Sequence, residues 1–208
     1  KLYLNAELKN SICQTIATSE YPFYIVDGNT VLLYSTDKKY YKPGETVTIT
    51  GEVQNRATIT ASALSLQLSA NSQNIYSATF DVPANGTHPF TITTIAGSEG
   101  TYTLAGKVTQ NNSTLVEIND QYEVAQPKVS VSVSVAEVAG NEPFDINVEM
   151  KNEGKVAVSS QLSAASGQGQ IIDNQQITIP AGETKLIQYQ QQITGNTNYT
   201  FTFTGDIN

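Results

Sequence analysis

The sequence predicts an all-β protein of two tandem β-sandwich domains, and three observations point to this fold class. Apolar and polar residues alternate with a period of two, which is typical of strands with one buried face. Turn signals such as Pro43-Gly44 and Asn85-Gly86 separate these runs at short intervals. The two halves of the chain also repeat one another. No apolar stripe with helical spacing occurs, so many short strands and regular turns favour sandwiches.

The clearest alternation lies in the second half. Valines at 129, 131, 133 and 135 alternate with serines, and we expect one face of this strand, the valine face, to be buried. The next run places Phe144, Ile146, Val148 and Met150 on one face. Both runs therefore predict strands that contribute to a core.

The length and one break in composition predict the domain organisation. The chain has 208 residues, which suits two domains of about 100 residues each. Pro127 ends one strand region immediately before the valine alternation begins. We therefore predict an N-terminal tail over residues 1–10, one sandwich over 11–126 and a second over 127–208.

Three pairs of matching segments carry the internal repeat. They are Gln67-Leu68-Ser69-Ala70 with Gln161-Leu162-Ser163-Ala164, Val82-Pro83-Ala84 with Ile179-Pro180-Ala181, and Tyr102-Thr103 with Tyr199-Thr200. Gly100 before Tyr102 is similar to the tyrosine corner that opens strand F of immunoglobulin-like sandwiches. Together with Ile-Pro-Ala-Gly-Glu-Thr over 179–184, these turns resemble the immunoglobulin-like domains of prokaryotic surface proteins, including the CARDB group. The resemblance covers residues 38–208 and implies two tandem immunoglobulin-like β-sandwiches.

The repeat also predicts that the second domain lacks its last strand. After Tyr102 the first half continues through a turn at Asn111-Asn112 into a further strand over 115–124, which we assign as strand G. After Tyr199 only the residues of strand F remain, so strand G of the second domain is absent. Such a sandwich would expose an apolar groove and unpaired backbone groups.

A strand that could fill this groove begins at residue 2. Apolar residues alternate with polar ones there, and they are Leu2, Leu4, Ala6 and Leu8. We expect this segment to be a donor-type strand that completes the second domain of the next identical subunit, giving a head-to-tail homopolymer. In plan, the chain resembles archaeal thread filaments and other donor-strand pili. Two alternatives stay open: the segment is the first strand of its own domain, or the chain is a piece whose following residues supply strand G.

Composition excludes several classes of function. The net charge of −8 with only 11 basic residues argues against nucleic acid and anionic membranes as partners. The apolar runs are too short to span a bilayer. The single cysteine, Cys13, and single histidine, His88, permit neither an internal disulfide nor a Cys/His metal site. We therefore expect no enzyme activity, no metal and no cofactor.

Four glycosylation sequons are the remaining candidate sites. Each has Ser or Thr two places on and no intervening proline, and their asparagines are Asn85, Asn111, Asn112 and Asn198. The sequence thus predicts an extracellular, N-glycosylated filament subunit at the cell surface. The alternative function is an adhesion or binding module of a larger surface protein that contacts other cells or surfaces.

Overall fold

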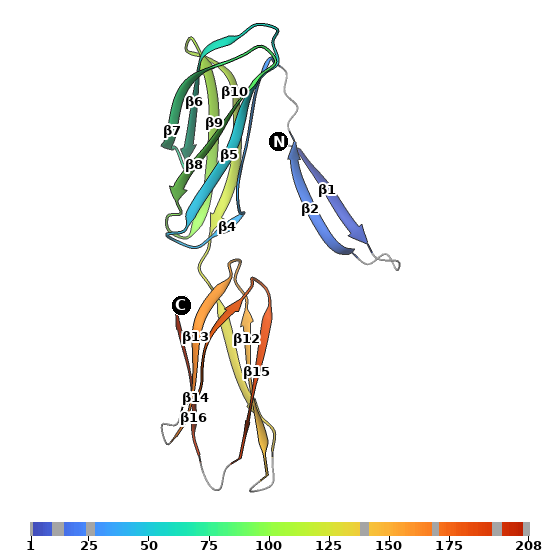
Figure 1. The fold of residues 1–208 in the computed structure, drawn as a ribbon, viewed down its shortest axis with the longest axis vertical. Helices are drawn as coiled ribbons and strands as arrows, with labels where there is room; N and C mark the ends of the chain where they lie inside the picture. The colour runs from blue at the N-terminus through green and yellow to red at the C-terminus, as the bar shows by residue number, and fades with distance from the viewer. Residues whose placement is uncertain are drawn as a thin grey trace. The chain divides into compact units, whose positions relative to one another are not determined.

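The computed structural model describes the backbone of residues 2–9, 15–23, 28–137, 142–167, 171–192 and 197–205. Side chains are described for 28–137, 142–167, 172–192 and 197–205. All regular elements in these ranges are β-strands (Figure 1). The same ranges contain no helix that is long and apolar enough to cross a membrane. The predicted fold class, two tandem immunoglobulin-like β-sandwiches, is confirmed.

The first sandwich packs a three-stranded sheet against a five-stranded one. The three-stranded sheet has the order β3 (Thr30–Thr36), β5 (Thr46–Asn55), β8 (Thr87–Ile95). The five-stranded sheet has the order β4 (Tyr40–Tyr41), β10 (Ser113–Val124), β9 (Gly100–Gln110), β6 (Ala61–Ala70), β7 (Gln73–Val82). The short strand β4 runs parallel to the end of β10.

The second sandwich consists of two three-stranded sheets in the described residues. One has the order β11 (Val129–Val135), β12 (Phe144–Asn152), β15 (Thr184–Gln191). The other has the order β14 (Ile171–Ile179), β13 (Val158–Ser166), β16 (Tyr199–Gly205). Its core is the apolar cluster of Phe144, Ile146, Val148, Met150, Leu162, Ala164, Ile177, Ile179 and Tyr189.

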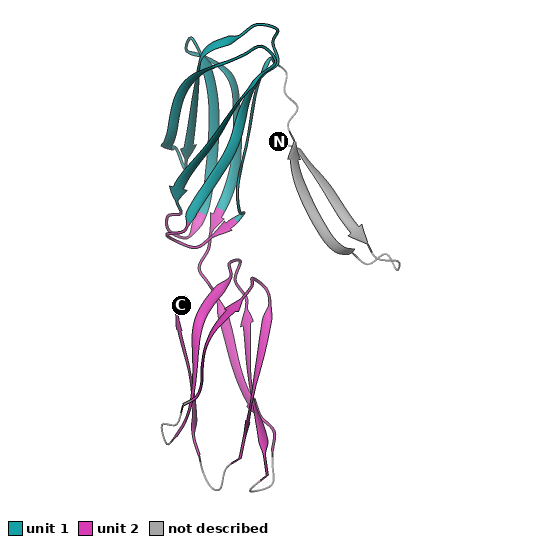
Figure 2. Cartoon of the chain, viewed as in Figure 1, with its two compact units in different colours: residues 1–39, 46–95, 101–122 teal, residues 40–45, 96–100, 123–208 magenta. Residues whose placement is uncertain are grey.

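The chain forms two compact units (Figure 2). One consists of residues 1–39, 46–95 and 101–122, and the other of residues 40–45, 96–100 and 123–208. The second unit thus contains the whole second sandwich together with β4 and short neighbouring segments of the first. Within it, the Lys155 ammonium contacts both carboxylate oxygens of Glu123 at 2.6 and 2.8 Å.

The N-terminal segment forms a separate two-stranded sheet. Strand β1 (Leu2–Lys9) pairs antiparallel with β2 (Thr15–Phe23), from Leu2 opposite Phe23 to Leu8 opposite Ala17. The predicted strand at residue 2 is therefore present, and it pairs with β2. The side chains of both strands lie outside the described residues, and so does Cys13.

Two hairpins turn through residues with positive φ. Asn71 and Ser72 join β6 to β7, and Asn111 and Asn112 join β9 to β10 with φ of 48° and 63°. A two-residue loop with both φ values positive is the type I′ turn, which matches the right-handed twist of paired strands. Asparagine tolerates this conformation better than most residues. The predicted turn at Asn111-Asn112 is confirmed.

A buried asparagine recurs at the same place in both sandwiches. Asn55 ends β5 and Asn152 ends β12, each in phase with the buried residues of its strand and at most 2% exposed. The Asn152 amide donates to the carbonyls of Val156, Ile179 and Pro180 at 2.9 to 3.1 Å, and its Oδ1 accepts from Gly154 N–H.

The Asn55 amide makes the equivalent bonds. It donates to the carbonyls of Ile59, Val82 and Pro83, and its Oδ1 accepts from Ala57 N–H. One side chain thus connects the loop after its own strand to the end of another strand, β7 in the first sandwich and β14 in the second. The buried asparagine is part of the repeated unit, as are the Val82 and Ile179 segments beside it.

The substitution Asn55→Ala is expected to lower the free energy of unfolding of the first sandwich by about 1–3 kcal/mol, because it leaves buried carbonyls without a donor. Asn55→Asp should cost at least as much, since a carboxylate oxygen would then face those carbonyls. Urea unfolding followed by circular dichroism measures the change. The exposed Asn119 on β10 is the matched control, and equal losses from Asn119→Ala and Asn55→Ala would contradict the argument.

Tyr189 ties the two sheets of the second sandwich together. Its hydroxyl on β15 donates to Asp173 Oδ2 on β14 at 2.9 Å, and the residue is 8% exposed. Burial, together with the hydrogen bond to Asp173, raises the pKa of the Tyr189 hydroxyl from 10.0 to about 12. This bond lies on the side of the sandwich formed by the edge strands β14 and β15.

The raised pKa predicts a loss of stability at high pH. A group whose pKa is higher in the folded state stabilises the fold below its unfolded pKa of 10.0, and that contribution is lost as the pH rises through about 12. We expect the urea midpoint to fall between these pH values. Tyr189→Phe should make the dependence shallower, because phenylalanine cannot ionise. An unchanged slope in the variant would contradict this assignment.

Candidate functional site: the open side of the second sandwich

The two sandwiches share six strands in the same order. Strands β3, β5 and β8 correspond to β11, β12 and β15, while β6, β7 and β9 correspond to β13, β14 and β16. Register supports the match: Tyr34 lies opposite Gly51, and Val133 lies opposite Val148 at the equivalent place. Strands β10 and β4 have no counterpart among the described residues of the second sandwich.

In the first sandwich, β10 covers the inner face of β3. The Tyr34 hydroxyl of β3 donates to the carbonyls of Leu104 on β9 and Ile118 on β10 at 2.8 and 2.9 Å. Tyr34 is 5% exposed and Leu32, two residues earlier, is fully buried. Ile118 and Tyr122 of β10 are buried in turn. The inner face of β3, the edge strand of one sheet, is therefore covered by β10, which takes the position of strand G in the other sheet.

In the second sandwich, the equivalent face of β11 is uncovered. Val131 and Val133 lie opposite Met150 and Val148, and directly opposite residues share a face of the sheet. Met150 and Val148 are fully buried, yet Val131, Val133 and Val135 are 42%, 48% and 52% exposed. The expectation that the valine face is buried is therefore wrong for these three residues. The physical reason is that no described strand takes the place that β10 has in the first sandwich.

Strand β16 forms the other margin of this uncovered face. It pairs with β13, with Phe203 opposite Leu162 and Phe201 opposite Ala164, and it is the edge of its sheet in the described residues. Tyr199, Phe201 and Phe203 are half-buried against the core cluster. An edge strand presents a row of backbone donors and acceptors to an incoming strand.

We call this region the open side. Its members are apolar or aromatic, come from β11 and β16, and are Val131, Val133, Val135, Tyr199, Phe201 and Phe203.

The side chains at the open side differ in size from their counterparts. In the first sandwich the Tyr34 ring fills space that exists because Gly106 has no side chain: a Cβ at Gly106 would collide with Tyr34 Cε1. In the second sandwich a small residue, Val133, takes the place of Tyr34, and Phe203 takes the place of Gly106. The second sandwich therefore has no side chain like Tyr34 that reaches from β11 toward the G position.

The chemistry that this arrangement supports is strand addition. None of the six residues of the open side is charged, so recognition would come from apolar burial and from backbone hydrogen bonds to β16. An incoming strand needs apolar residues at alternate positions, as β10 has with Ile118, Tyr122 and Val124.

The four sequon asparagines are all exposed. Asn111 and Asn112 form the β9–β10 turn, Asn85 lies in the turn before β8 with φ of 52°, and Asn198 directly precedes β16. His88 lies on β8 with its ring stacked on Phe80, the ring centroids 3.7 Å apart. Among the described residues, no group of three or more His, Cys, Asp or Glu side chains could hold a metal ion.

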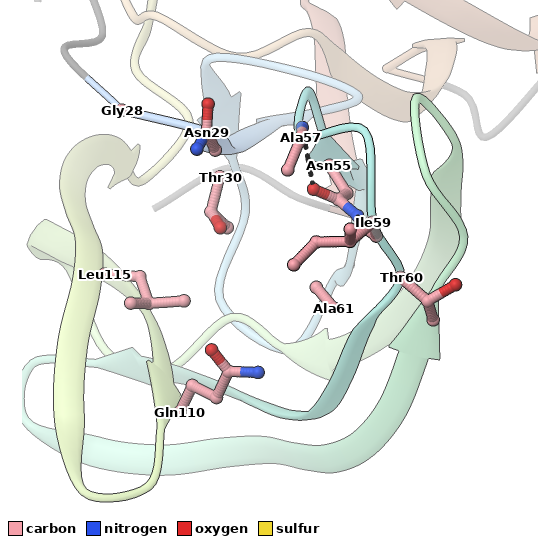
Figure 3. Close-up of a pocket in the computed structure, with 10 residues that line it drawn as sticks. All are labelled: Gly28, Asn29, Thr30, Asn55, Ala57, Ile59, Thr60, Ala61, Gln110 and Leu115. Atoms are coloured by element: carbon pink, nitrogen blue, oxygen red, sulfur yellow. Dashed lines mark hydrogen bonds between the residues drawn. The ribbon is translucent and has the colours of Figure 1, made fainter.

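A pocket of about 350 Å³ lies in the first sandwich between the end of β9, the start of β10 and the loop after β5 (Figure 3). Exposed Ile59 and Leu115 and the amide of Gln110 belong to its lining. The lining has no carboxylate, imidazole or thiol, so it offers no acid–base group. The Asn55 amide at its wall is already engaged by the loop carbonyls. The open side is therefore the stronger candidate site.

No protein-family model and no curated protein matches this sequence. Solved structures with similar folds exist at low identity. A CARDB domain from Pyrococcus furiosus, solved in complex with di-metal ions, is 12% identical with a TM-score of 0.43, and the match covers 46% of this chain and 86% of that one.

Two larger proteins also contain similar regions. Red sea bream transglutaminase is 11% identical with a TM-score of 0.40, and the match covers 88% of this chain and 30% of that one. Salmonella alpha-2-macroglobulin reacted with methylamine has the same identity and TM-score, and the match covers 98% of this chain and 17% of that one. These likenesses are too distant to carry an argument about function, which rests on the residues themselves.

Proposed function

We propose that this chain is a structural subunit of an extracellular filament at the cell surface, assembled head to tail by strand donation. The N-terminal strand β1 of one subunit adds to β16 of the next and covers the open side. The observation that carries the proposal is the exposure of Val131, Val133 and Val135 on a face whose neighbours in register are fully buried. The subunit performs no chemistry in this proposal.

The energies involved permit a stable junction. Full burial of a valine is worth about 1.5–3 kcal/mol, and these three are already about half buried, so covering them contributes roughly 2–4 kcal/mol. Each leucine of the donor strand that becomes fully buried adds about 1.5–3 kcal/mol. Each ladder hydrogen bond to β16 adds about 0.5–1.5 kcal/mol. Association costs about 4–15 kcal/mol of translational and rotational freedom. The balance is favourable when most of the strand engages.

Glycans are part of the proposal. Asn85, Asn111 and Asn112 lie in exposed turns, and Asn198 is exposed beside the edge strand β16. A glycan adds a large polar group, which an exposed turn accommodates without loss of packing. Mass spectrometry of protein from its native source tests which sequons are occupied.

Deleting residues 1–9 should abolish filaments while leaving both sandwiches folded, because the deletion removes the donor and leaves the strands of both sandwiches, β3 to β16, in place. Negative-stain microscopy and size-exclusion chromatography of the full chain and the deletion variant measure this. Circular dichroism of the deletion variant checks the fold.

A full chain that stays monomeric at every concentration would contradict the proposal. The alternative, an adhesion or binding module of a larger surface protein, would then be favoured, with strand G supplied by residues that follow Asn208 in the native protein. That version predicts that adding those residues covers the valines of β11 within one chain.

Charge at the open side should also block assembly. Val133→Asp places a carboxylate where the donor must pack, so we expect loss of filaments, since burying an unpaired charge is costly. Ser132→Asp is the matched control, because Ser132 is exposed on the opposite face of the same strand. Equal filament yields for the two variants, counted by electron microscopy, would argue against this face as the acceptor.

A further inference from the structure

The number of strands differs between the equivalent sheets of the two sandwiches, and the difference indicates what could complete the open side. The complete sheet of the first sandwich has the order β4-β10-β9-β6-β7, whereas its counterpart has only β16-β13-β14 in the described residues. Two positions are therefore unfilled next to β16, the one that β10 holds and the one that β4 holds. The N-terminal sheet has two strands, β1 and β2.

The register of the N-terminal hairpin gives it one apolar face. Leu4 lies opposite Tyr21, and Leu8 opposite Ala17. Directly opposite residues share a face, so Leu2, Leu4, Ala6 and Leu8 lie on the same face as Ala17, Ser19, Tyr21 and Phe23, and Ser19 is the one polar residue among them. The other face carries Tyr3 with Pro22, Asn5 with Glu20 and Glu7 with Thr18, so it is the more polar of the two.

Strand β1 also has a second edge. In the described residues it pairs with β2 alone, so the edge away from β2 has no partner there. A strand with one paired edge can still add to another sheet through its other edge. Strand β1 can therefore pair with β16 while it remains paired with β2.

We infer that the donated unit is the whole β1–β2 hairpin, with β1 in the position of β10 and β2 in the position of β4. This inference rests on the proposed filament function and specifies its donor. The completed sheet has the order β2-β1-β16-β13-β14, five strands as in the first sandwich. It differs in one respect, because β2 is antiparallel to β1 whereas β4 is parallel to β10.

Donation of the hairpin avoids a cost that donation of β1 alone carries. Pairing with β16 by an isolated β1 would first require the ladder from Leu2 opposite Phe23 to Leu8 opposite Ala17 to open, with loss of its backbone bonds. It would also leave β2 with no partner. The hairpin keeps these bonds and offers an apolar face two strands wide.

Locking the hairpin with a disulfide separates the two modes of donation. The variant Asn5→Cys/Glu20→Cys places a cysteine pair on the polar face at directly opposite positions, where Cα separations of about 4.5–5.5 Å suit a disulfide. Cys13→Ser, present in every protein of the set, removes the only natural cysteine. Glu7→Cys/Thr18→Cys provides a second lock with the same logic. Mass spectrometry confirms the bond before assembly begins.

The expected result is that oxidised and reduced forms of each locked variant give equal filament yields, because the hairpin enters intact. Loss of filaments on oxidation, restored by reduction, would mean that β1 has to separate from β2 before it is donated. That result overturns the inference about the hairpin but remains consistent with donation of β1 alone. If the Cys13→Ser parent gives no filaments while the natural chain also stays monomeric, the proposed function fails and this inference fails with it. Filaments in both states together with their loss on deletion of residues 1–9 support both.

Discussion

Covering the inner face of each sheet is the constraint on which the rest of this structure depends. A sandwich is stable only where an apolar face meets another, because the burial of apolar area is the main favourable term. In the first sandwich β10 extends the second sheet far enough to cover β3, and Leu32 and Tyr34 are buried as a result. The second sandwich has the same core but a narrower described sheet, so the valines of β11 stay half exposed.

The ties between sheets follow from this difference. In the first sandwich Tyr34 bonds across from β3 to β9 and β10, at the side that β10 closes. In the second, Tyr189 bonds to Asp173 at the opposite side, between β15 and β14. The buried Asn55 and Asn152 are common to both sandwiches, because they bond to the ends of β7 and β14, which lie away from the G position. In the part of the chain that the structure describes, the repeated unit is therefore complete except on the side of β11 and β16.

Sequence patterns predicted the strands, the turn at Asn111-Asn112 and the repeat, since local alternation and turn chemistry determine these features. They also predicted that the second domain lacks a partner for strand F. They could not predict the exposure of Val131, because alternation records which way a side chain points but not whether another strand covers it.

The roles of Asn55 and Asn152 were missed, although each stands in phase with buried apolar residues. A polar residue at a buried position of the alternation, repeated at the equivalent position in the other half of the chain, is a signal by which such residues can be found. The pairing of β1 with β2 was not predicted either, since no strand was predicted over residues 15–23.

The change in residue size at the open side bears on what can fill it. Tyr34 reaches from β3 to β10, and this is possible because Gly106 leaves room for its ring. With Val133 in that place, no residue of β11 has a side chain as long as that of Tyr34. A strand that enters there must therefore bring its own large apolar side chains, whereas β10 meets a tyrosine from the opposite sheet. Leucine at three of four alternate positions in β1 meets this need, whereas a strand of small residues would leave a cavity.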